Sequence, residues 1–330
     1  MNLTTTYMGF TLPHPLVPGA SPMVDDLDTA RRLEDAGAPM LVMHSLFEEQ
    51  IVREEMSVHR SIEAAAESFG EALSYLPQPE EFSLGPDEYL EQVRKLKKAV
   101  SIPVIASLNG TSEGGWLRYA RLIEQAGADG LELNLYDLST DTDESGETIE
   151  RRQLDVVRAV CDAVKIPLAV KLSPFYSSMA NFAHRLDRLG IDALVLFNRF
   201  YHPEIDIESL ELRRVNPSSP SELPLRLRWI GVLSGRLSAS LAATGGVHSA
   251  DGVIRCVMAG AHAVQMVSAL LSHGPEYLET VRRDLAQWLE EHEYESLQQM
   301  QGSMSLLKCG DPAAYQRANY MRILNSWQAD

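Results

Sequence analysis

Short apolar runs alternate with stretches of helical spacing along most of the chain, and this alternation restricts the possible folds more than any other feature. The apolar runs of strand length begin near residues 15, 40, 102, 129, 167, 192, 240 and 263. The stretches with helical spacing are 26–36, 87–99, 114–126, 150–163, 178–189, 221–233, 249–259 and 274–292. Repeated units of this kind favour a parallel sheet covered by helices, and eight of them predict an α/β fold of the closed (β/α)8 TIM barrel type.

An open, doubly wound sheet is the alternative fold for the same alternation. Such sheets commonly carry a Gly-x-Gly-x-x-Gly turn after a strand, where the glycines let the backbone approach a nucleotide. No turn of this type follows any of the predicted strands. The sequence therefore favours the barrel over the open sheet.

The alternation is interrupted at two places and stops near residue 300. Residues 46–88 are rich in Glu and show no clear strand period, and this segment is too long for an ordinary connection. We predict that it forms an excursion or lid over the site. A second irregular segment covers 199–220. The predicted domains are a barrel over 1–300 and, over 301–330, a C-terminal helical extension that packs on the barrel or on a partner.

Charge and composition restrict the class of partner. The chain of 330 residues has a formal net charge of -17 at pH 7, and 45% of its residues are hydrophobic. An acidic surface disfavours nucleic acid and anionic membranes, and no apolar run is long enough to span a bilayer. The expected partner is therefore a small-molecule substrate.

The cysteines and histidines give no sign of a metal or disulfide site. Cys161, Cys256 and Cys309 are widely spaced, and the His residues do not follow metal-ligand spacing. The first residues also lack the basic and apolar regions of a signal peptide. We therefore predict no metal and a cytoplasmic location.

The stretch 131–137 brings polar side chains to the end of a predicted strand. Apolar residues alternate there with Glu132, Asn134 and Tyr136, and Asp137 begins a segment that cannot continue a strand. Barrel enzymes keep their active sites at the carboxyl ends of the strands, so an amide and a carboxylate are predicted to lie in the site. An edge strand with one solvated face is the alternative interpretation.

Small residues and amides follow most of the predicted strands. The residues just past the strands are Ala20, Ser21, His44, Ser45, Asn109, Asn134, Lys171, Asn198, Thr244, Gly245, Gly246, Val267 and Ser268. Asn and Lys side chains can hydrogen-bond a flat ring rich in heteroatoms. The glycine pair and the small residues after the last two strands leave main-chain N–H groups for a phosphate, where barrels commonly bind one. Together they predict a planar phosphorylated cofactor.

Lys171 and His44 differ in the strength of their signals. Lys171 ends the apolar run 168–170, and a buried ammonium must meet an anion or lose its proton. This makes a functional role the favoured interpretation for Lys171. A lone His after an apolar strand, such as His44, is more often a structural group.

These residues resemble the dihydroorotate dehydrogenase family, in particular its soluble cytosolic branch. The matching motifs are Glu132-Leu-Asn-Leu135, Val170-Lys-Leu-Ser-Pro174, Thr244-Gly-Gly246 and Gly260-Ala-x-Ala-Val-Gln265. The resemblance implies an FMN oxidoreductase that acts on a carbon–carbon bond and transfers hydride to or from flavin N5.

The resemblance also implies roles for individual residues. Ala20, Ser21, Ser45, Asn109, Asn134 and Lys171 would contact the flavin, and Gly245, Gly246, Val267 and Ser268 would hold its phosphate. Asn134 and Asn198 would bind substrate, a small cyclic amide-like molecule. A homodimer and a separate redox partner protein are further expectations from this resemblance.

The chain departs from the family pattern at four places. Asp137 replaces the Cys or Ser that serves as the family's base, and His44 replaces a lysine, so the implied catalytic residues are Asp137, Lys171 and His44. Residues 76–83 replace an Asn-rich substrate loop, and 216–221 replace a glycine-rich phosphate loop. A carboxylate substrate such as orotate would lose one fixed cation, which makes it an unfavourable substrate here.

Two other functions fit the same residues. Lys171 could form a Schiff base in a barrel aldolase or other lyase. The altered base position could also mark a flavin-binding partner subunit with altered catalysis.

Overall fold

Eight parallel strands form one sheet that is nearly closed as a barrel. The computed structural model describes residues 1–47, 85–109, 116–135, 140–198, 204–213 and 217–316. The strands of the large sheet are β3 (Leu16–Pro18), β4 (Leu41–Phe47), β5 (Val104–Asn109), β6 (Gly130–Asn134), β7 (Leu168–Leu172), β8 (Ala193–Leu196), β11 (Ser240–Thr244) and β12 (Ala263–Met266). Their order is β3-β12-β11-β8-β7-β6-β5-β4, and a parallel bridge between Ser21 and Met43 joins the two ends. The predicted (β/α)8 barrel is confirmed.

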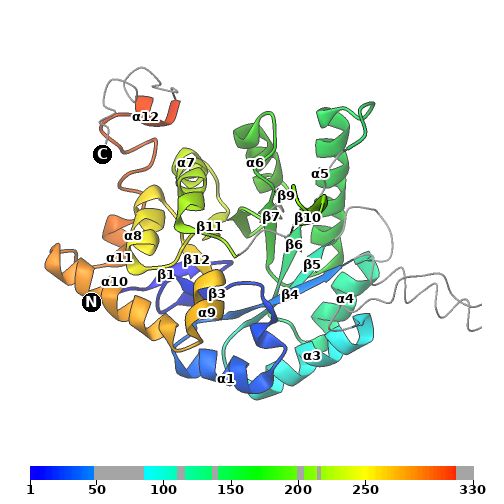
Figure 1. The fold of residues 1–330 in the computed structure, drawn as a ribbon, viewed down its shortest axis with the longest axis horizontal. Helices are drawn as coiled ribbons and strands as arrows, with labels where there is room; N and C mark the ends of the chain where they lie inside the picture. The colour runs from blue at the N-terminus through cyan, green and yellow to red at the C-terminus, as the bar shows by residue number, and fades with distance from the viewer. Residues whose placement is uncertain (48–84, 110–115, 136–139, 199–203, 214–216, 317–330) are drawn as a thin grey trace, which may run out of the picture.

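The helices lie around the outside of the strands, except the short C-terminal helix, which is set farther out, as Figure 1 shows. They are α1 (Leu27–Asp35), α3 (Pro86–Ala99), α4 (Trp116–Ala126), α5 (Gly146–Ala163), α6 (Met179–Asp187), α7 (Leu223–Leu233), α8 (Ala250–Ala259), α9 (Ser268–His273), α10 (Tyr277–Glu291), α11 (Leu297–Met300) and α12 (Ala313–Gln316). Helix α1 illustrates the local rules: Asp26 accepts a hydrogen bond from Thr29 N at its start, and Ala30 and Leu33 face the core. It ends before Gly37, whose φ is +94°.

Three predicted features differ from the structure. Helix α5 begins at Gly146 rather than at 150, because Ser145 accepts a hydrogen bond from Thr148 N and caps the helix ahead of the predicted start. The predicted helix 274–292 corresponds to α10, which begins at Tyr277, and the short helix α9, which ends before Gly274 with its φ of +85°, was not predicted. The edge-strand interpretation of 131–137 is wrong, because β6 is buried between β5 and β7.

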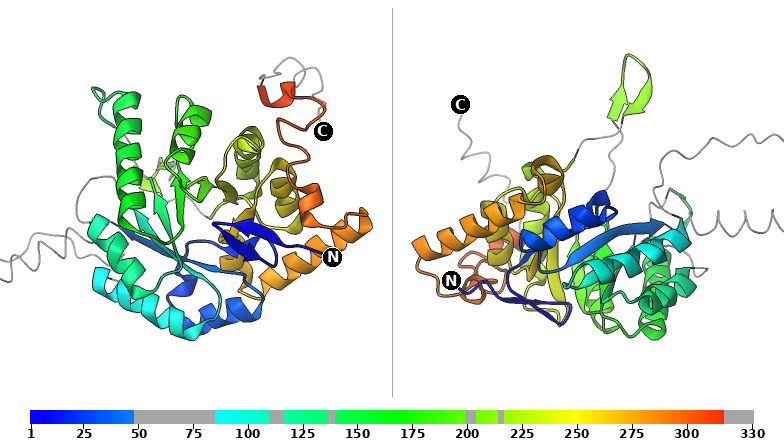
Figure 2. Two further views of the ribbon diagram at one scale, coloured as in Figure 1. Left: turned by 180° about the vertical axis from the view of Figure 1, so that it is seen from behind. Right: turned by 90° about the horizontal axis from the view of Figure 1, so that it is seen from below.

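An N-terminal hairpin that the sequence did not predict closes one end of the barrel. Strands β1 (Thr5–Tyr7) and β2 (Phe10–Leu12) pair antiparallel. Tyr7, Met8 and Leu12 are buried and pack with residues of the barrel interior. Met8 N donates a hydrogen bond of 3.1 Å to Ser240 Oγ at the start of β11. The hairpin, dark blue in Figure 2, therefore covers the amino ends of the strands and leaves their carboxyl ends for the site.

A second hairpin lies within the segment that the sequence left irregular. Strands β9 (Glu204–Asp206) and β10 (Glu211–Arg213) pair antiparallel and follow β8 in the chain. The right-hand view of Figure 2 shows this hairpin extending away from the barrel. Ile205, Ile207 and Leu210 are largely exposed on it.

The C-terminal segment contacts the barrel over its described part. Leu306 N donates to Gly231 O of α7 at 2.9 Å, and Arg228 Nη1 donates to Tyr315 O, also at 2.9 Å. Residues 317–330 of the predicted extension and 48–84 of the predicted lid lie outside the described residues, so these two assignments stay predictions.

Two short 3-10 helices, η1 (Pro22–Val24) and η2 (Pro220–Glu222), precede α1 and α7.

The described part of the chain has no helix suited to crossing a membrane and no cluster of potential metal ligands. None of its helices combines the length and the apolar character that crossing a bilayer requires. Within the same residues, no group of three His, Cys, Asp or Glu side chains is arranged to hold a metal ion.

Candidate active site

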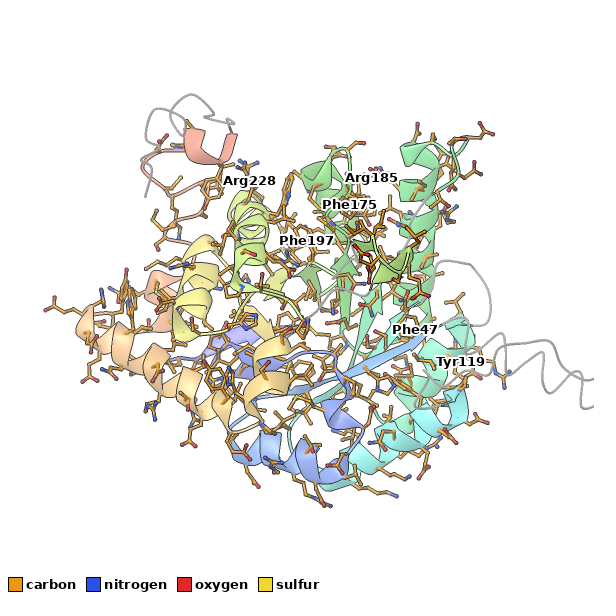
Figure 3. The ribbon with its side chains drawn as sticks, viewed as in Figure 1. Phe47, Tyr119, Phe175, Arg185, Phe197 and Arg228 are labelled. Atoms are coloured by element: carbon orange, nitrogen blue, oxygen red, sulfur yellow. The ribbon has the colours of Figure 1, made fainter. Side chains whose placement is uncertain are left out.

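Two adjoining hollows open at the carboxyl ends of the barrel strands. The wide hollow, of about 590 Å³, is lined by Ala20, Ser21, Pro22, His44, Ser45, Phe47, Asn109, Asn134, Lys171 and Asn198. The glycine hollow, of about 400 Å³, is lined by Ala20, Lys171, Phe197, Asn198, Pro217, Ser218, Thr244, Gly245, Gly246, Val247, Gln265, Val267, Ser268 and Leu271. Phe47 and Phe197, labelled in Figure 3, belong to the wide hollow and the glycine hollow respectively. The two hollows meet at Ala20, Lys171 and Asn198.

The structure brings together all the predicted site residues that it describes. Each of the twelve lines at least one of the two hollows. Asp137, the predicted base, lies outside the described residues, so its role stays a prediction. The strand-end rule of barrels was therefore sufficient to collect the residues, although it says nothing of how they contact one another.

An irregularity in β4 places two consecutive side chains in the wide hollow. The pairing of β4 with β5 shifts register between Val42 and Ser45, so His44 and Ser45 both line the hollow instead of alternating. The Tyr89 hydroxyl bonds to both strands where their pairing is irregular. It donates toward His44 O and Ser107 O, both at 3.0 Å, and accepts from Ser107 N at 2.8 Å. Tyr89 thus holds the backbone that presents His44 and Ser45. It is a contributor that the sequence analysis missed.

His44 is paired with a carboxylate. Its Nδ1 lies 2.6 Å from Asp25 Oδ1, and its ring meets the Tyr89 ring edge-on with centroids 5.3 Å apart. Gln92 of α3 fixes the backbone on the other side of the pair, because its Nε2 donates to Val24 O and Asp25 O. The residue that replaces the family's lysine is therefore an imidazole that lies against a carboxylate.

Asn134 lines the wide hollow and is anchored through its amide nitrogen. Its Nδ2 donates to Ser45 Oγ at 2.9 Å, to Ser107 Oγ at 2.8 Å and to Leu108 O at 3.3 Å. The Leu108 contact decides which amide atom is nitrogen, since a carbonyl oxygen can only accept. The Asn134 Oδ1 is then the atom left to accept a hydrogen bond from a ligand in the hollow.

Lys171 meets an anion inside the barrel. Its Nζ donates to Glu132 Oε1 at 3.1 Å, and Gln265 Nε2 donates to Glu132 Oε2 at 2.6 Å. Burial of the Tyr7 phenol, and secondarily the charge of Glu132, raise the pKa of Tyr7 well above its usual value. The apolar run before Lys171 predicted an anion near its ammonium group, but the alternating pattern placed Glu132 only on the polar face of a strand.

Three segments meet around the glycine hollow. Ser218 N donates to Ser268 Oγ at 3.0 Å, the two hydroxyl oxygens lie 2.9 Å apart, and Gly246 N donates to Ser218 Oγ at 3.3 Å. Ser218 belongs to the segment 216–221, which the sequence analysis treated only as a replacement for a glycine-rich loop. The structure instead adds its hydroxyl to the same hollow as the predicted Gly246 and Ser268.

The turn at Gly245 and Gly246 requires glycine at both positions. Their φ angles are +88° and +79°, a region that other residues rarely adopt. A Cβ on Gly246 would lie 2.7 Å from Leu223 N. Behind the turn, the buried Arg226 donates through Nε to Thr244 O at 3.0 Å and through Nη1 to Glu222 O at 2.9 Å. The turn is therefore anchored to the start of α7.

Comparison with known proteins decides the family. The family model for dihydroorotate dehydrogenase matches residues 82–289. The chain belongs to the dihydroorotate dehydrogenase family. Members of this family are dehydrogenases that act on CH–CH groups, so the predicted enzyme class is confirmed. The match begins after β3 and β4, which means that His44 and Ser45 lie outside the matched part.

The individual relatives are distant. A protein of Aeropyrum pernix assigned as dihydroorotate dehydrogenase A (fumarate) is 30% identical over 211 residues, which cover 61% of this chain and 67% of that protein. The catalytic subunit of dihydroorotate dehydrogenase B (NAD(+)) of Geobacter sp. strain M21 is 29% identical over 234 residues, 68% of this chain and 75% of that protein. The NAD-dependent dihydropyrimidine dehydrogenase subunit PreA of Escherichia coli K12 is 23% identical over 321 residues, 91% of this chain and 76% of that protein.

Proposed function

We propose that this protein is an FMN-dependent oxidoreductase that oxidises or reduces a carbon–carbon bond in a small cyclic amide. The observation that carries the proposal is the junction of the two hollows at Lys171, with amide side chains on one side and a glycine and serine turn on the other. A phosphorylated planar cofactor has one part suited to each hollow. When bound, FMN supplies a ring that accepts or gives hydride at N5.

The residues of the glycine hollow fit a phosphate. The hydroxyl oxygens of Ser218 and Ser268 lie 2.9 Å apart. Gly245 and Gly246, whose positive φ angles favour glycine, leave the turn without side chains. Gln265 also lines this hollow, and its buried Oε1, which has no hydrogen-bond partner among the described residues, is an acceptor that suits an N–H group of the cofactor ring rather than the phosphate. We assign Gly245, Gly246, Val267 and Ser268 to the phosphate, as the sequence predicted, and add Ser218.

The residues of the wide hollow fit a ring and a substrate beside it. Ala20, Ser21, Ser45 and Asn109 would contact the flavin, and Asn134 and Asn198 would orient the substrate. Lys171, held at 3.1 Å from Glu132, would place an ammonium next to the ring and stabilise negative charge that develops there. Asp137 would exchange a proton with the substrate carbon, because a carboxylate can serve as a general base. His44 would line the wide hollow beside these residues.

The names of two relatives support a partner protein for this chain. One is named a catalytic subunit and another is named a subunit of an NAD-dependent enzyme. We propose by analogy that this chain passes electrons to or from a separate redox partner, while the homodimer rests on the family resemblance alone. The lyase alternative has less support, because Lys171 Nζ already donates to Glu132 and the family consists of dehydrogenases.

Anaerobic reduction tests the proposal. The full chain is loaded with FMN and mixed with a panel of dihydropyrimidines, and the flavin absorbance is followed. We expect at least one compound to bleach the oxidised flavin. Absence of reduction by every compound, together with borohydride trapping of a carbonyl substrate on Lys171, would favour the lyase instead.

A further inference from the structure

The basic groups on the described wall of the wide hollow each have a carboxylate partner. These groups are His44 and Lys171. Asp25 Oδ1 lies 2.6 Å from His44 Nδ1, and Glu132 Oε1 lies 3.1 Å from Lys171 Nζ. The exposed fractions are 18% for His44, 22% for Asp25, 10% for Lys171 and 1% for Glu132. Water can therefore screen these charges only partly.

Neither pair gives the hollow a net positive charge. If His44 is protonated, its charge and that of ionised Asp25 cancel; if His44 is neutral, the pair is negative. The Lys171 and Glu132 charges cancel as well. An anionic group on a ligand would thus approach two carboxylates without meeting an unpaired cation on the described wall, in a setting where Coulomb interactions are stronger than in water.

The pair at His44 is held in place from both sides. Gln92 Nε2 donates to Asp25 O at 2.9 Å, and the Tyr89 hydroxyl donates toward His44 O at 3.0 Å. The same hollow offers the Asn134 carbonyl as an acceptor for an N–H group. Its chemistry is that of a site for an uncharged ring bearing amide N–H groups.

We propose that the wide hollow selects an uncharged cyclic amide over the same ring carrying a carboxylate, and that Asp25, through its pair with His44, sets this selectivity. The inference rests on the proposed function, because it names the substrate class of that site. Asp25 acts through His44 and is therefore a specificity-determining residue rather than a catalytic one.

Uracil and orotate are a matched pair of probes, since orotate is uracil with a carboxylate added at one ring carbon. Binding of each to the full FMN-loaded chain is measured by calorimetry, and the flavin spectrum of the same sample is recorded. We expect the wild-type protein to bind uracil at least about tenfold more tightly than orotate. Calorimetry detects the ring whether or not flavin is bound, so loss of flavin would contradict the proposed function while the uracil to orotate ratio reports on this inference.

Variants isolate the role of Asp25. Asp25→Asn removes the carboxylate at constant size and is expected to lower the ratio about tenfold, mainly by tighter orotate binding. Asp28→Asn makes the same charge change at a position that is 85% exposed on α1, and it should leave the ratio unchanged. The double variant D25N/H44K, which places an ammonium without its carboxylate in the hollow, should reverse the preference.

Four results would overturn the inference. They are equal or tighter binding of orotate by the wild type, an unchanged ratio in folded Asp25→Asn, an unchanged preference in the double variant, and failure of the protein to bind uracil. Circular dichroism identifies a variant that has not folded, and the wild-type ratio then still decides the selectivity.

Discussion

Lys171 Nζ and Glu132 Oε1 lie 3.1 Å apart inside the barrel, on the neighbouring strands β7 and β6. Gln265 reaches the other oxygen of Glu132 from β12, which is not adjacent to β6 in the sheet. Three strands therefore share one buried ion pair beneath the junction of the two hollows. The position of Lys171 is fixed by the barrel itself before any ligand binds.

Removing the cation of this pair should destabilise the protein strongly. Lys171→Met leaves Glu132, which is 1% exposed, without its counter-ion, and such a loss typically costs about 3 to 5 kcal/mol. Adding Glu132→Gln should recover most of that loss, because no buried charge is then left unpaired. Urea unfolding of the single and double variants measures both effects, and strictly additive losses would show that the two side chains do not interact.

The Tyr89 hydroxyl should matter both for stability and for the site. Tyr89→Phe leaves Ser107 N without its acceptor in a buried position, a loss of about 1 to 3 kcal/mol. It should also weaken ligand binding in the wide hollow, since it frees the backbone of His44. The control is Tyr277→Phe, which removes a hydroxyl donor to His248 O outside that hollow. Equal ligand affinities in the two variants would contradict a positioning role for Tyr89.

Gly246 should be intolerant of a side chain for two reasons that can be separated. Gly246→Ala combines a φ of +79° with a Cβ 2.7 Å from Leu223 N, whereas Gly190→Ala has a φ of +85° and open space around the Cβ. In the Gly190 variant only the backbone strain should lower the free energy of unfolding, by about 1 to 2 kcal/mol. The Gly246 variant should lose more stability in urea unfolding and also bind FMN less tightly. Matched losses and unchanged FMN affinity would refute this assignment.

Stability should fall below neutral pH because of His14. Burial lowers the pKa of His14 from 6.5 to about 4. Its Nε2 contacts Gly37 O at 2.7 Å, and its Nδ1 accepts from Leu16 N, so the folded protein requires the neutral ring. Between these two pH values the unfolded chain binds a proton that the folded protein does not, and unfolding becomes easier by about 2 kcal/mol at pH 5 and about 3 kcal/mol near pH 4.

Urea unfolding at pH 7 and pH 5 measures this dependence. His14→Gln should be less stable than wild type at pH 7 but should show a smaller drop between the two pH values. The same drop in both proteins would assign the pH dependence to other groups.

The barrel and the residues at its rim were predictable because their signals are local. Alternation, helical spacing and the turn after each strand decide where an element ends, and the carboxyl ends of parallel strands share one face. This is why Asn134, Lys171 and Gly246, which are far apart in the sequence, were expected to lie in one site. The hydrophobic period also placed Glu132 in a strand, but it did not show that both faces of that strand are buried.

The contacts between segments were not predictable in the same way. The hairpin β1–β2 has strands of three residues, and its burial depends on the barrel that it closes. In the sequence, Tyr89 is only an apolar position of a helix. Its hydroxyl bonds to β4 and β5, and these bonds are visible only in the folded structure. Ser218 and Asp25 gain their partners only from segments that folding brings near. These pairings depend on tertiary structure, and the hydrophobic periodicity of a single segment carries no information about it.

The central claim, that the rim of the barrel holds FMN with its phosphate at Ser218, Gly246 and Ser268, is tested most directly by comparing the affinities of FMN and riboflavin. The two molecules differ only in the phosphate, and fluorescence quenching measures both with the full chain. We expect FMN to bind about 100-fold more tightly, the effect of two or so hydrogen bonds to a charged group. Equal affinities, or no binding of either flavin, would contradict the account.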